Sequence, residues 1–423
     1  MPGPLDATLS IVIPTLNAGP EFALLLRKLR TQTGLRELEI VVVDSGSTDG
    51  TVELARAAGA RVVEIAAADF SHSSARNLGA DQARGDHLLF MVQDAYPIGE
   101  RWAYGMLRYL QDHAGSGVVA VSCAEYCRND SDIMVDCMIQ THYRFLGCQE
   151  ADRIGQHIGD AHEQLRAMGQ LSDVACLIPR TRFMQYRYRG TYAEDLDLGV
   201  RLIRDRHRIA MLASVKVIHS HNRGPHYYLK RGFVDGVFLA EVFTDLAVPR
   251  WESAAGLVSG AVYVGQCVSE WTARLATEGL SMPLPDLADA WLDQLARWPV
   301  PSPPHSAPMR LDDQRLAGFV DTLAQRALGA STGSASALRR DARRFVDGFI
   351  VRFNHFNRYA AAVFPGDDES LRREWAGAAC KTYAATLGAL LAELHLDSRA
   401  RPASHIEART WIEHLRTELK AGI

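Results

Sequence analysis

Residues 40–51 have the sequence IVVVDSGSTDGT, in which an apolar β-branched run ends at an aspartate and a turn of small polar residues. Residues 9–17 (LSIVIPTLN) repeat this design earlier in the chain. The runs that predict strands are 9–14, 39–44, 60–65 and 87–92, and those that predict helices lie near 20–32, 50–58 and 72–84. This alternation predicts a parallel α/β sheet whose carboxyl-end loops converge on one crevice.

Composition limits the classes of protein that fit. At 423 residues the chain exceeds one ordinary domain core, which predicts two domains. A net charge of −4 argues against a nucleic-acid partner, which needs a basic surface. Seven cysteines without a C-x-x-C pair indicate a reducing compartment. The first residues show no export signal and no apolar run is long enough to span a membrane, so we expect a cytoplasmic protein.

The pattern becomes helical from about residue 226, and the stretch near residue 300 is too rich in proline for a helix interior. We expect a catalytic domain at 1–245, a helical extension at 246–298, a proline-rich linker at 299–310 and a helical bundle at 311–423. The helices predicted in the bundle are 311–329, 335–363, 369–396 and 403–421.

Four motifs occur in a fixed order. They are residues 9–17, residues 40–51, residues 74–80 (SARNLGA) and residues 88–97 (LLFMVQDAYP). Together they resemble the inverting glycosyltransferase family 2, and the form of the last two is similar to its rhamnosyltransferase-like branch. The resemblance covers roughly residues 8 to 245. It implies a GT-A fold, a Rossmann-like α/β domain that binds a nucleotide-diphosphate sugar, which is here followed by an α-helical domain.

The resemblance implies that the donor nucleotide lies against the loops after the first strands. A carboxylate at Asp44 can accept hydrogen bonds from a ribose hydroxyl or a base N–H, although a turn or helix cap is the alternative. The Arg76 guanidinium can clamp a diphosphate, and a solvated helical arginine is its alternative. The residues expected at the donor are Pro14, Thr15, Leu16, Asn17, Asp44, Ser45, His72, Arg76, Gln93 and Asp94.

A divalent cation is implied by the same resemblance. The family's metal motif is D-x-D; here Val92 replaces the first acid and Asp94 retains the second. One carboxylate with diphosphate oxygens and waters suffices for Mg²⁺. His219 and His221 follow a predicted strand and point to one face of an extended chain, so either can complete the shell. We expect Mg²⁺ or Mn²⁺ at Asp94, His219 and His221; a merely polar strand end is the alternative for the histidines.

The segment Tyr192–Leu202 (YAEDLDLGVRL) begins a helix with acidic residues. Inverting transfer needs one carboxylate to take the proton of the acceptor hydroxyl, and no second carboxylate for a covalent intermediate. We assign that role to Asp195. The alternative is that Glu194, Asp195 and Asp197 only favour the macrodipole in the first turn of the helix.

We therefore expect a metal-dependent inverting glycosyltransferase. By branch resemblance, the donor is dTDP-L-rhamnose and the acceptor a hydroxyl of a surface polysaccharide or lipid-linked glycan. A different donor such as a UDP-hexose is one alternative. A non-catalytic sugar-nucleotide-binding scaffold is another, which the loss of an acid at Val92 and the helical appendage allow.

The helical appendage contains an aromatic stripe formed by Phe345, Phe349, Phe353 and Phe356, with Arg339, Arg340, Arg343 and Arg344 nearby. Spacings of four, four and three residues place the four rings on one helix face. The stripe either rests on anionic lipid at the inner face of the membrane or forms the core of a bundle with the arginines at its rim.

Overall fold

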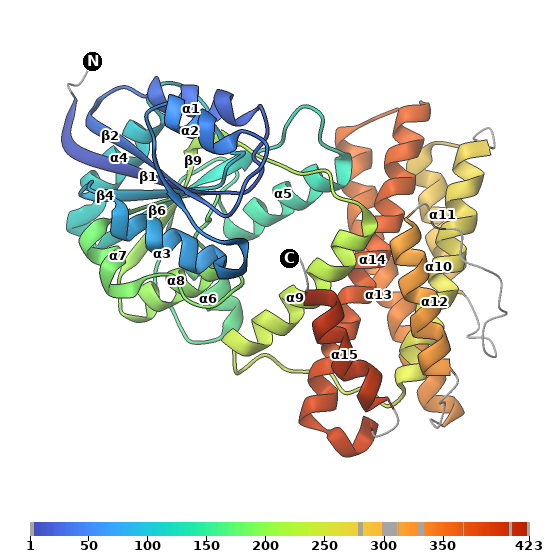
Figure 1. Cartoon of the computed structure of the whole chain (residues 1–423). Helices are drawn as coiled ribbons and strands as arrows, with labels where there is room; N and C mark the ends of the chain where they lie inside the picture. Colours follow the sequence, from blue (N-terminus) through green and yellow to red (C-terminus); the bar gives the residue numbers. More distant parts are fainter. Residues whose placement is uncertain are drawn as a thin grey trace. The chain divides into compact units, whose positions relative to one another are not determined.

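The computed structural model describes residues 4–277, 282–297, 311, 313–328, 334–366, 368–405 and 408–420. The chain forms two compact units, one of residues 1–131 with 138–221 and the other of residues 132–137 with 222–423. The first unit is an α/β domain and the second is helical (Figure 1), as the sequence predicts for the fold class.

Within the described residues, the first unit holds one nine-stranded sheet. Its strands are β1 (Leu5–Thr15), β2 (Leu35–Asp44), β3 (Arg61–Glu64), β4 (His87–Met91), β5 (Tyr96–Pro97), β6 (Val118–Tyr126), β7 (Arg153–Gly155), β8 (Ala175–Pro179) and β9 (Arg208–Ile218). Their order is β3-β2-β1-β4-β8-β6-β9-β5, and β7 pairs with β9. The first four strands are parallel as predicted, whereas β8 lies antiparallel between β4 and β6.

Helices cover both faces of this sheet (Figure 1). They are α1 (Phe22–Arg30), α2 (Thr51–Ala57), α3 (His72–Gln82), α4 (Trp102–His113), α5 (Ile133–Leu146), α6 (His162–Gly169), α7 (Arg180–Tyr186) and α8 (Glu194–Arg204). Successive residues of β1 and β2 are therefore buried on both sides, which explains their continuous apolar runs. Close packing of α3 on β1 requires Gly79, because a Cβ there would lie 2.3 Å from Val12 Cγ1.

The second unit is built from helices. They are α9 (Pro225–Val242), α10 (Ala254–Thr277), α11 (Leu284–Ala296), α12 (Gln314–Leu328), α13 (Ala335–Val363), α14 (Glu369–Ala400) and α15 (Arg409–Lys420). The four helices predicted after the linker are thus confirmed, with ends that differ by a few residues. The predicted linker at 299–310 lies outside the described residues.

Packing divides the chain differently from the predicted boundaries. Apart from residues 132–137, the second unit starts at residue 222 and not at 246, because α9 packs along α14. Gly388 allows this approach, since a Cβ there would lie 2.0 Å from the Leu229 carbonyl oxygen. Helix α10 packs on α13 in the same way, with Gly260 against the Ala342 carbonyl oxygen. The regions expected as a separate extension and bundle therefore form one helical unit.

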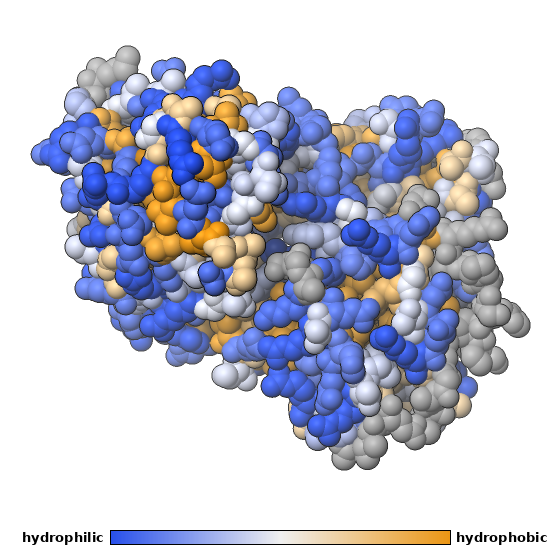
Figure 2. Space-filling model, viewed as in Figure 1, coloured by the Kyte–Doolittle hydropathy of each residue, from blue (hydrophilic) through white to orange (hydrophobic). Residues whose placement is uncertain are grey.

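The aromatic stripe of α13 is the core of this unit. Phe345, Phe349 and Phe353 are 0% exposed and Phe356 is 1% exposed. Flanking arginines are paired with acids, as in the bonds from Arg343 to Asp347, from Arg344 to Glu393 and from Arg340 to Glu252. Hydrophilic residues predominate on the visible face of the unit (Figure 2). The lipid-facing alternative is wrong for this stripe. Among the described helices, none is both long and apolar enough to cross a membrane.

Candidate active site

The loops after β1 and β2 are joined at Asp44. Its carboxylate is buried; Oδ1 accepts hydrogen bonds from the N–H groups of Gly46 (3.0 Å) and Ser47 (2.8 Å), and Oδ2 accepts one from Thr15 Oγ1 (2.8 Å). Ser45 donates from both its N–H and its hydroxyl to the Thr15 carbonyl. Burial raises the pKa of Asp44, but its hydrogen bonds, first among them the one that the Ser47 hydroxyl donates to Oδ2, outweigh burial, so the pKa is lowered. The Asp44 side chain therefore stabilises a turn, as the alternative interpretation of this residue expected. This turn lies at the end of β2, where the nucleotide is predicted to bind.

Gln93 connects the loop after β4 to the loop after β1. Its Oε1 accepts a hydrogen bond from the Leu16 N–H at 2.9 Å, and its Nε2 donates to the Leu16 carbonyl at 3.3 Å. Asn17, with a left-handed φ of 44°, donates its N–H to Ser47 Oγ and accepts from the Thr48 N–H through Oδ1. The three loops that were expected to converge do meet, and Leu16 remains 49% exposed at their edge.

Two other predicted donor residues lie beside these loops. Pro14 is half-buried in β1, opposite Val43 of β2. His72 is exposed at the start of α3, which Ser71 caps, and its ring lies edge-on to Phe70 at 5.1 Å between centroids.

Asp94, His219 and His221 come together as a three-residue set, as predicted. One ligand atom from each lies within 4.8 Å of the others. Asp94 Oδ2 is 3.1 Å from His221 Nε2, and Asp94 Oδ1 is 3.6 Å from His219 Nε2. Pairing of Tyr96 in β5 with Ile218 in β9 brings the two loops side by side. One carboxylate and two imidazoles are donors that suit a divalent transition cation, with coordination positions left for other ligands.

A carboxylate that sequence reasoning missed supports this set. Glu125 Oε2 lies 2.8 Å from His219 Nδ1, and the same carboxylate accepts a hydrogen bond from the Tyr143 hydroxyl. Because an ionised carboxylate only accepts, Nδ1 carries the proton and Nε2 is left as the ligand atom facing Asp94. Burial lowers the pKa of His219, but the bond to Glu125 and the charges of Glu125, Asp94 and Asp173 outweigh it, so that the pKa is raised.

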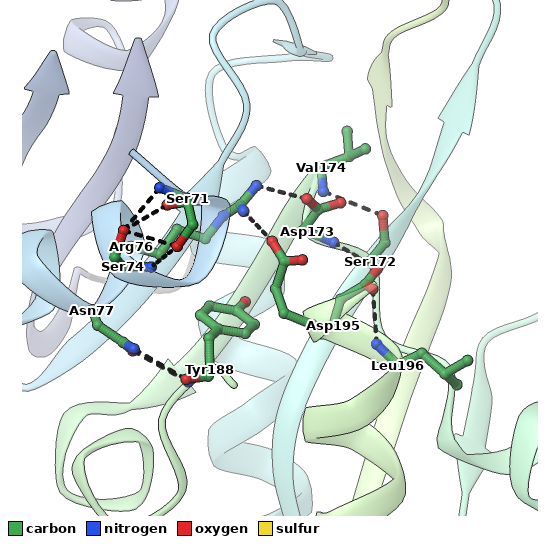
Figure 3. Close-up of polar contacts among 11 residues, drawn as sticks. Ser71, Ser74, Arg76, Asn77, Ser172, Asp173, Val174, Tyr188, Asp195 and Leu196 are labelled. Carbon is green, nitrogen blue, oxygen red and sulfur yellow. Dashed lines mark hydrogen bonds and ion pairs between the residues drawn. The ribbon is translucent and has the colours of Figure 1, made fainter. Parts of the chain in front are cut away.

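Asp195 lies in the first turn of α8, half-buried. Its Oδ1 accepts a hydrogen bond from the Leu196 N–H at 2.8 Å and its Oδ2 one from the Asp173 N–H at 3.3 Å (Figure 3). Burial, followed by the negative charges of Asp173 and Glu194, raises the pKa of Asp195 to about 8. A carboxylate with a raised pKa is a stronger base, and perturbed pKa values of this kind are concentrated at functional sites.

The neighbouring acid Asp197 has a different environment. It pairs with Arg201 one turn along α8, at 2.8 Å, and is partly exposed. For Asp197, the alternative interpretation, in which an acid at the start of the helix has only a structural role, therefore applies.

Arg76 does not lie where a diphosphate clamp was expected. Its side chain is 1% exposed, and its Nη2 and Nη1 donate to Asp173 Oδ2 (2.6 Å) and Glu194 Oε1 (2.5 Å). The alternative interpretation of Arg76 as a solvated helical arginine is also wrong, because the side chain is buried. A buried guanidinium engaged by two carboxylates presents no exposed donor to a diphosphate. Asp173, like Glu125, belongs to none of the four motifs and has no local signal in the sequence.

Comparison with known proteins finds a family match for part of the first unit. Residues 10–169 match the model of glycosyl transferase family 2. The chain carries a glycosyl transferase family 2 domain. The O-antigen chain rhamnosyltransferase RfbN of Salmonella typhimurium is 26% identical over 251 residues, which cover 55% of this chain and 72% of that protein. The O-antigen chain rhamnosyltransferase WbaN of Salmonella anatum is 23% identical over 248 residues, with the same coverage of 55% and 72%.

A likeness among solved structures spans more of the chain. The mannosyltransferase PcManGT from Pyrobaculum calidifontis, in complex with GDP-Man and Mn²⁺, matches 92% of this chain and 89% of its own with 17% identity and a TM-score of 0.44. The resemblance to the rhamnosyltransferase-like branch of glycosyl transferase family 2 is confirmed by the two Salmonella relatives. The family match ends before Asp173, Asp195 and the two histidines, which lie in the rest of the same compact unit.

Proposed function

We propose that this glycosyl transferase family 2 protein moves a sugar, with inversion, from a nucleoside-diphosphate sugar to a hydroxyl of a glycan. The observation that carries the proposal is that one compact unit contains both the Asp195 carboxyl group, fixed by two backbone N–H groups, and a three-residue cation set. The two rhamnosyltransferase relatives favour dTDP-L-rhamnose as donor and a surface polysaccharide or lipid-linked glycan as acceptor.

Asp195 is the proposed catalytic base. As the acceptor oxygen bonds to the anomeric carbon, the bond from that carbon to the diphosphate oxygen breaks on the opposite face, and Asp195 takes the hydroxyl proton. A single displacement inverts the anomeric carbon and needs no carboxylate nucleophile. The hydrogen bonds from the backbone N–H groups of Leu196 and Asp173 hold the Asp195 carboxyl group in place.

Asp94, His219 and His221 are the proposed holders of the cation. When bound, a divalent cation supplies positive charge that stabilises the departing diphosphate. Mg²⁺ prefers oxygen ligands only, whereas imidazole suits transition metals, so we infer that Mn²⁺ binds this set more tightly than Mg²⁺. Glu125 holds His219 in the tautomer that binding requires.

The loops around Asp44 are proposed to receive the nucleotide. Asp44 keeps the loops in place through bonds to Thr15, Gly46 and Ser47. Leu16 offers an exposed apolar side chain to a base. The other residues proposed to line the donor are Pro14, Asn17, Ser45, His72, Gln93 and Asp94.

We infer that the second unit positions the enzyme or the acceptor, because the proposed base and cation set belong to the first unit. We infer a cytoplasmic enzyme, since the seven cysteines, all of which lie within the described residues, form no disulfide. We also infer that it meets a lipid-linked acceptor at the inner face of the membrane.

A donor panel tests this proposal. The full-length protein would be incubated with dTDP-L-rhamnose, UDP-glucose or GDP-mannose and Mn²⁺, and released nucleoside diphosphate would be measured beside thermal stability. A donor at 100 times its dissociation constant should stabilise the protein by about 2.7 kcal/mol. Stabilisation and turnover with dTDP-L-rhamnose support the proposal. Turnover with UDP-glucose alone supports the UDP-hexose alternative, and stabilisation without any turnover supports the non-catalytic scaffold.

A further inference from the structure

Arg76 is among the largest fully buried side chains of the protein. It extends from α3 to two carboxylates that are distant in the sequence, Glu194 at 118 residues and Asp173 at 97 residues. Figure 3 shows its contact with Asp173. Glu194 is itself only 3% exposed. A buried carboxylate without a partner would be strongly destabilising, so this guanidinium is what allows Glu194 to begin α8 inside the protein.

Asp195 is linked to both residues that Arg76 binds, to Glu194 through the chain and to Asp173 through a hydrogen bond. Asp195 follows Glu194 directly in α8, and its Oδ2 accepts from the backbone N–H of Asp173. The residues on either side of the Asp195 carboxylate are thus the two residues that Arg76 binds. Displacing either one moves the carboxylate relative to the sheet.

The residue after Arg76 restrains the segment that leads to α8. Asn77 Nδ2 donates to the Tyr188 carbonyl at 3.0 Å, and Asn77 Oδ1 accepts from the Tyr188 N–H at 3.2 Å. The Tyr188 ring lies beside the guanidinium, with 5.8 Å from Arg76 Cζ to the ring centroid. Two successive residues of α3 therefore fix the approach to α8 and its first turn.

We propose that Arg76 is a positioning residue, whose guanidinium ties Asp173 to Glu194 and thereby holds the Asp195 carboxylate in place for proton removal. This inference rests on the proposed function, in which Asp195 is the base. It replaces the expected contact of Arg76 with the diphosphate.

The charges around Asp195 make the role measurable. The ionisable groups that face it are Arg76 from α3, Asp173 before β8, Cys176 in β8, Tyr188 before α8 and Glu194 in α8. Burial raises the pKa of Cys176 to about 12 and that of Tyr188 well above its ordinary value, so both stay neutral at working pH. The charge near Asp195 is then set by one cation and two carboxylates.

Three variants separate positioning from charge. Arg76→Lys keeps the positive charge but loses the planar fork that reaches two carboxylates. Asp173→Asn and Glu194→Gln each remove one negative charge near Asp195. Asp197→Asn is the matched control, because it removes one negative charge two residues after Asp195 in α8, at a partly exposed carboxylate that pairs with Arg201.

Release of dTDP from dTDP-L-rhamnose would be followed across mildly acidic to mildly alkaline pH, with Asp195→Asn in parallel. We expect Arg76→Lys to lower kcat by at least about 10-fold, a part of the 10²–10⁴-fold worth of a general base, with the donor KM unchanged. Asp173→Asn and Glu194→Gln should move the acidic limb of the profile to lower pH, and Asp197→Asn should leave it in place. A loss of folded protein alone would change the amplitude of a profile but not its position.

The pKa of Asp195 would also be measured without any donor, from the carboxyl carbon-13 signals of aspartate-labelled full-length protein, assigned with Asp195→Asn. A lowered pKa in the partly exposed Asp173→Asn variant, with no change in Asp197→Asn, supports the inference even where Glu194→Gln fails to fold. If Arg76→Lys and Asp173→Asn match Asp197→Asn in both measurements while Asp195→Asn is inactive, the positioning role is refuted and the base stands. A fully active Asp195→Asn enzyme would instead refute the proposed function.

Discussion

Glu125 and His219 are joined by a 2.8 Å hydrogen bond between Oε2 and Nδ1. This bond determines which nitrogen of His219 is available to a cation. Nδ1 must carry the proton that it shares with the carboxylate, so Nε2 is available. The bond links β6 to the end of β9, and Tyr143 of α5 holds the same carboxylate from the other side.

Removing the charge of Glu125 should weaken cation binding without removing a ligand. We expect Glu125→Gln to reduce the affinity for Mn²⁺ by about 10–100-fold, the usual effect of losing an outer partner of a metal-binding histidine. Electron paramagnetic resonance of free Mn²⁺ measures this in the absence of donor. Glu64→Gln, at an exposed carboxylate paired with Arg56, is the control and should bind Mn²⁺ as the parent does.

Asp94→Ala should abolish Mn²⁺ binding, because it removes the sole carboxylate of the three-residue set. Chelator treatment of the parent should stop nucleoside diphosphate release, and Mn²⁺ should restore it at lower concentration than Mg²⁺. Undiminished release in excess chelator would show that the departing diphosphate needs no cation here.

The raised pKa of Asp195 has a consequence for stability. A group whose pKa is raised from 3.8 to about 8 on folding keeps its proton in the folded state over a range in which the unfolded chain has lost it. Stability from this source is therefore full below the ordinary carboxyl pKa and is lost as pH rises toward 8. Urea titrations should show that Asp195→Asn, which cannot ionise, loses less stability than the parent between acidic and alkaline pH. Parallel pH profiles for the two proteins would contradict the raised pKa.

The position of the aromatic stripe predicts a large difference between neighbouring residues of α13. Phe349→Ala should destabilise the protein by about 3–5 kcal/mol, as expected for truncating a buried aromatic side chain. Val351→Ala, at a side chain 69% exposed, should change stability by less than about 0.5 kcal/mol. Chemical denaturation measures both, and equal effects would contradict the assignment of Phe349 to the core.

The sequence predicts well what is encoded locally. The apolar runs around Val42 and Ile13 locate two neighbouring buried strands, and the helices after the linker are found from their periodicity. The Asp94, His219 and His221 set also follows from local motifs, because each residue lies within three residues of the end of β4 or β9. These features depend on residues that are close together in the chain.

Features that depend on distant residues were missed or misassigned. Arg76 looks like a surface residue until α8 and the start of β8 bring Glu194 and Asp173 to it from about a hundred residues away. Glu125 stands at the end of an ordinary strand, and its role exists only because β9 lies beside β6. The boundary at 245 was misplaced for the same reason, since helix periodicity does not reveal that α9 packs on α14.

The most direct test of the central claim compares the parent with Asp195→Asn. Asparagine keeps the shape of the side chain but cannot take the proton from the hydroxyl of the acceptor. Donor binding should therefore persist while turnover falls by about 10²–10⁴-fold. Both are measured on one preparation, donor affinity by calorimetry with dTDP-L-rhamnose and Mn²⁺, and turnover by dTDP release. Retained affinity with lost turnover is the result this account predicts, and turnover at the parental rate would contradict it.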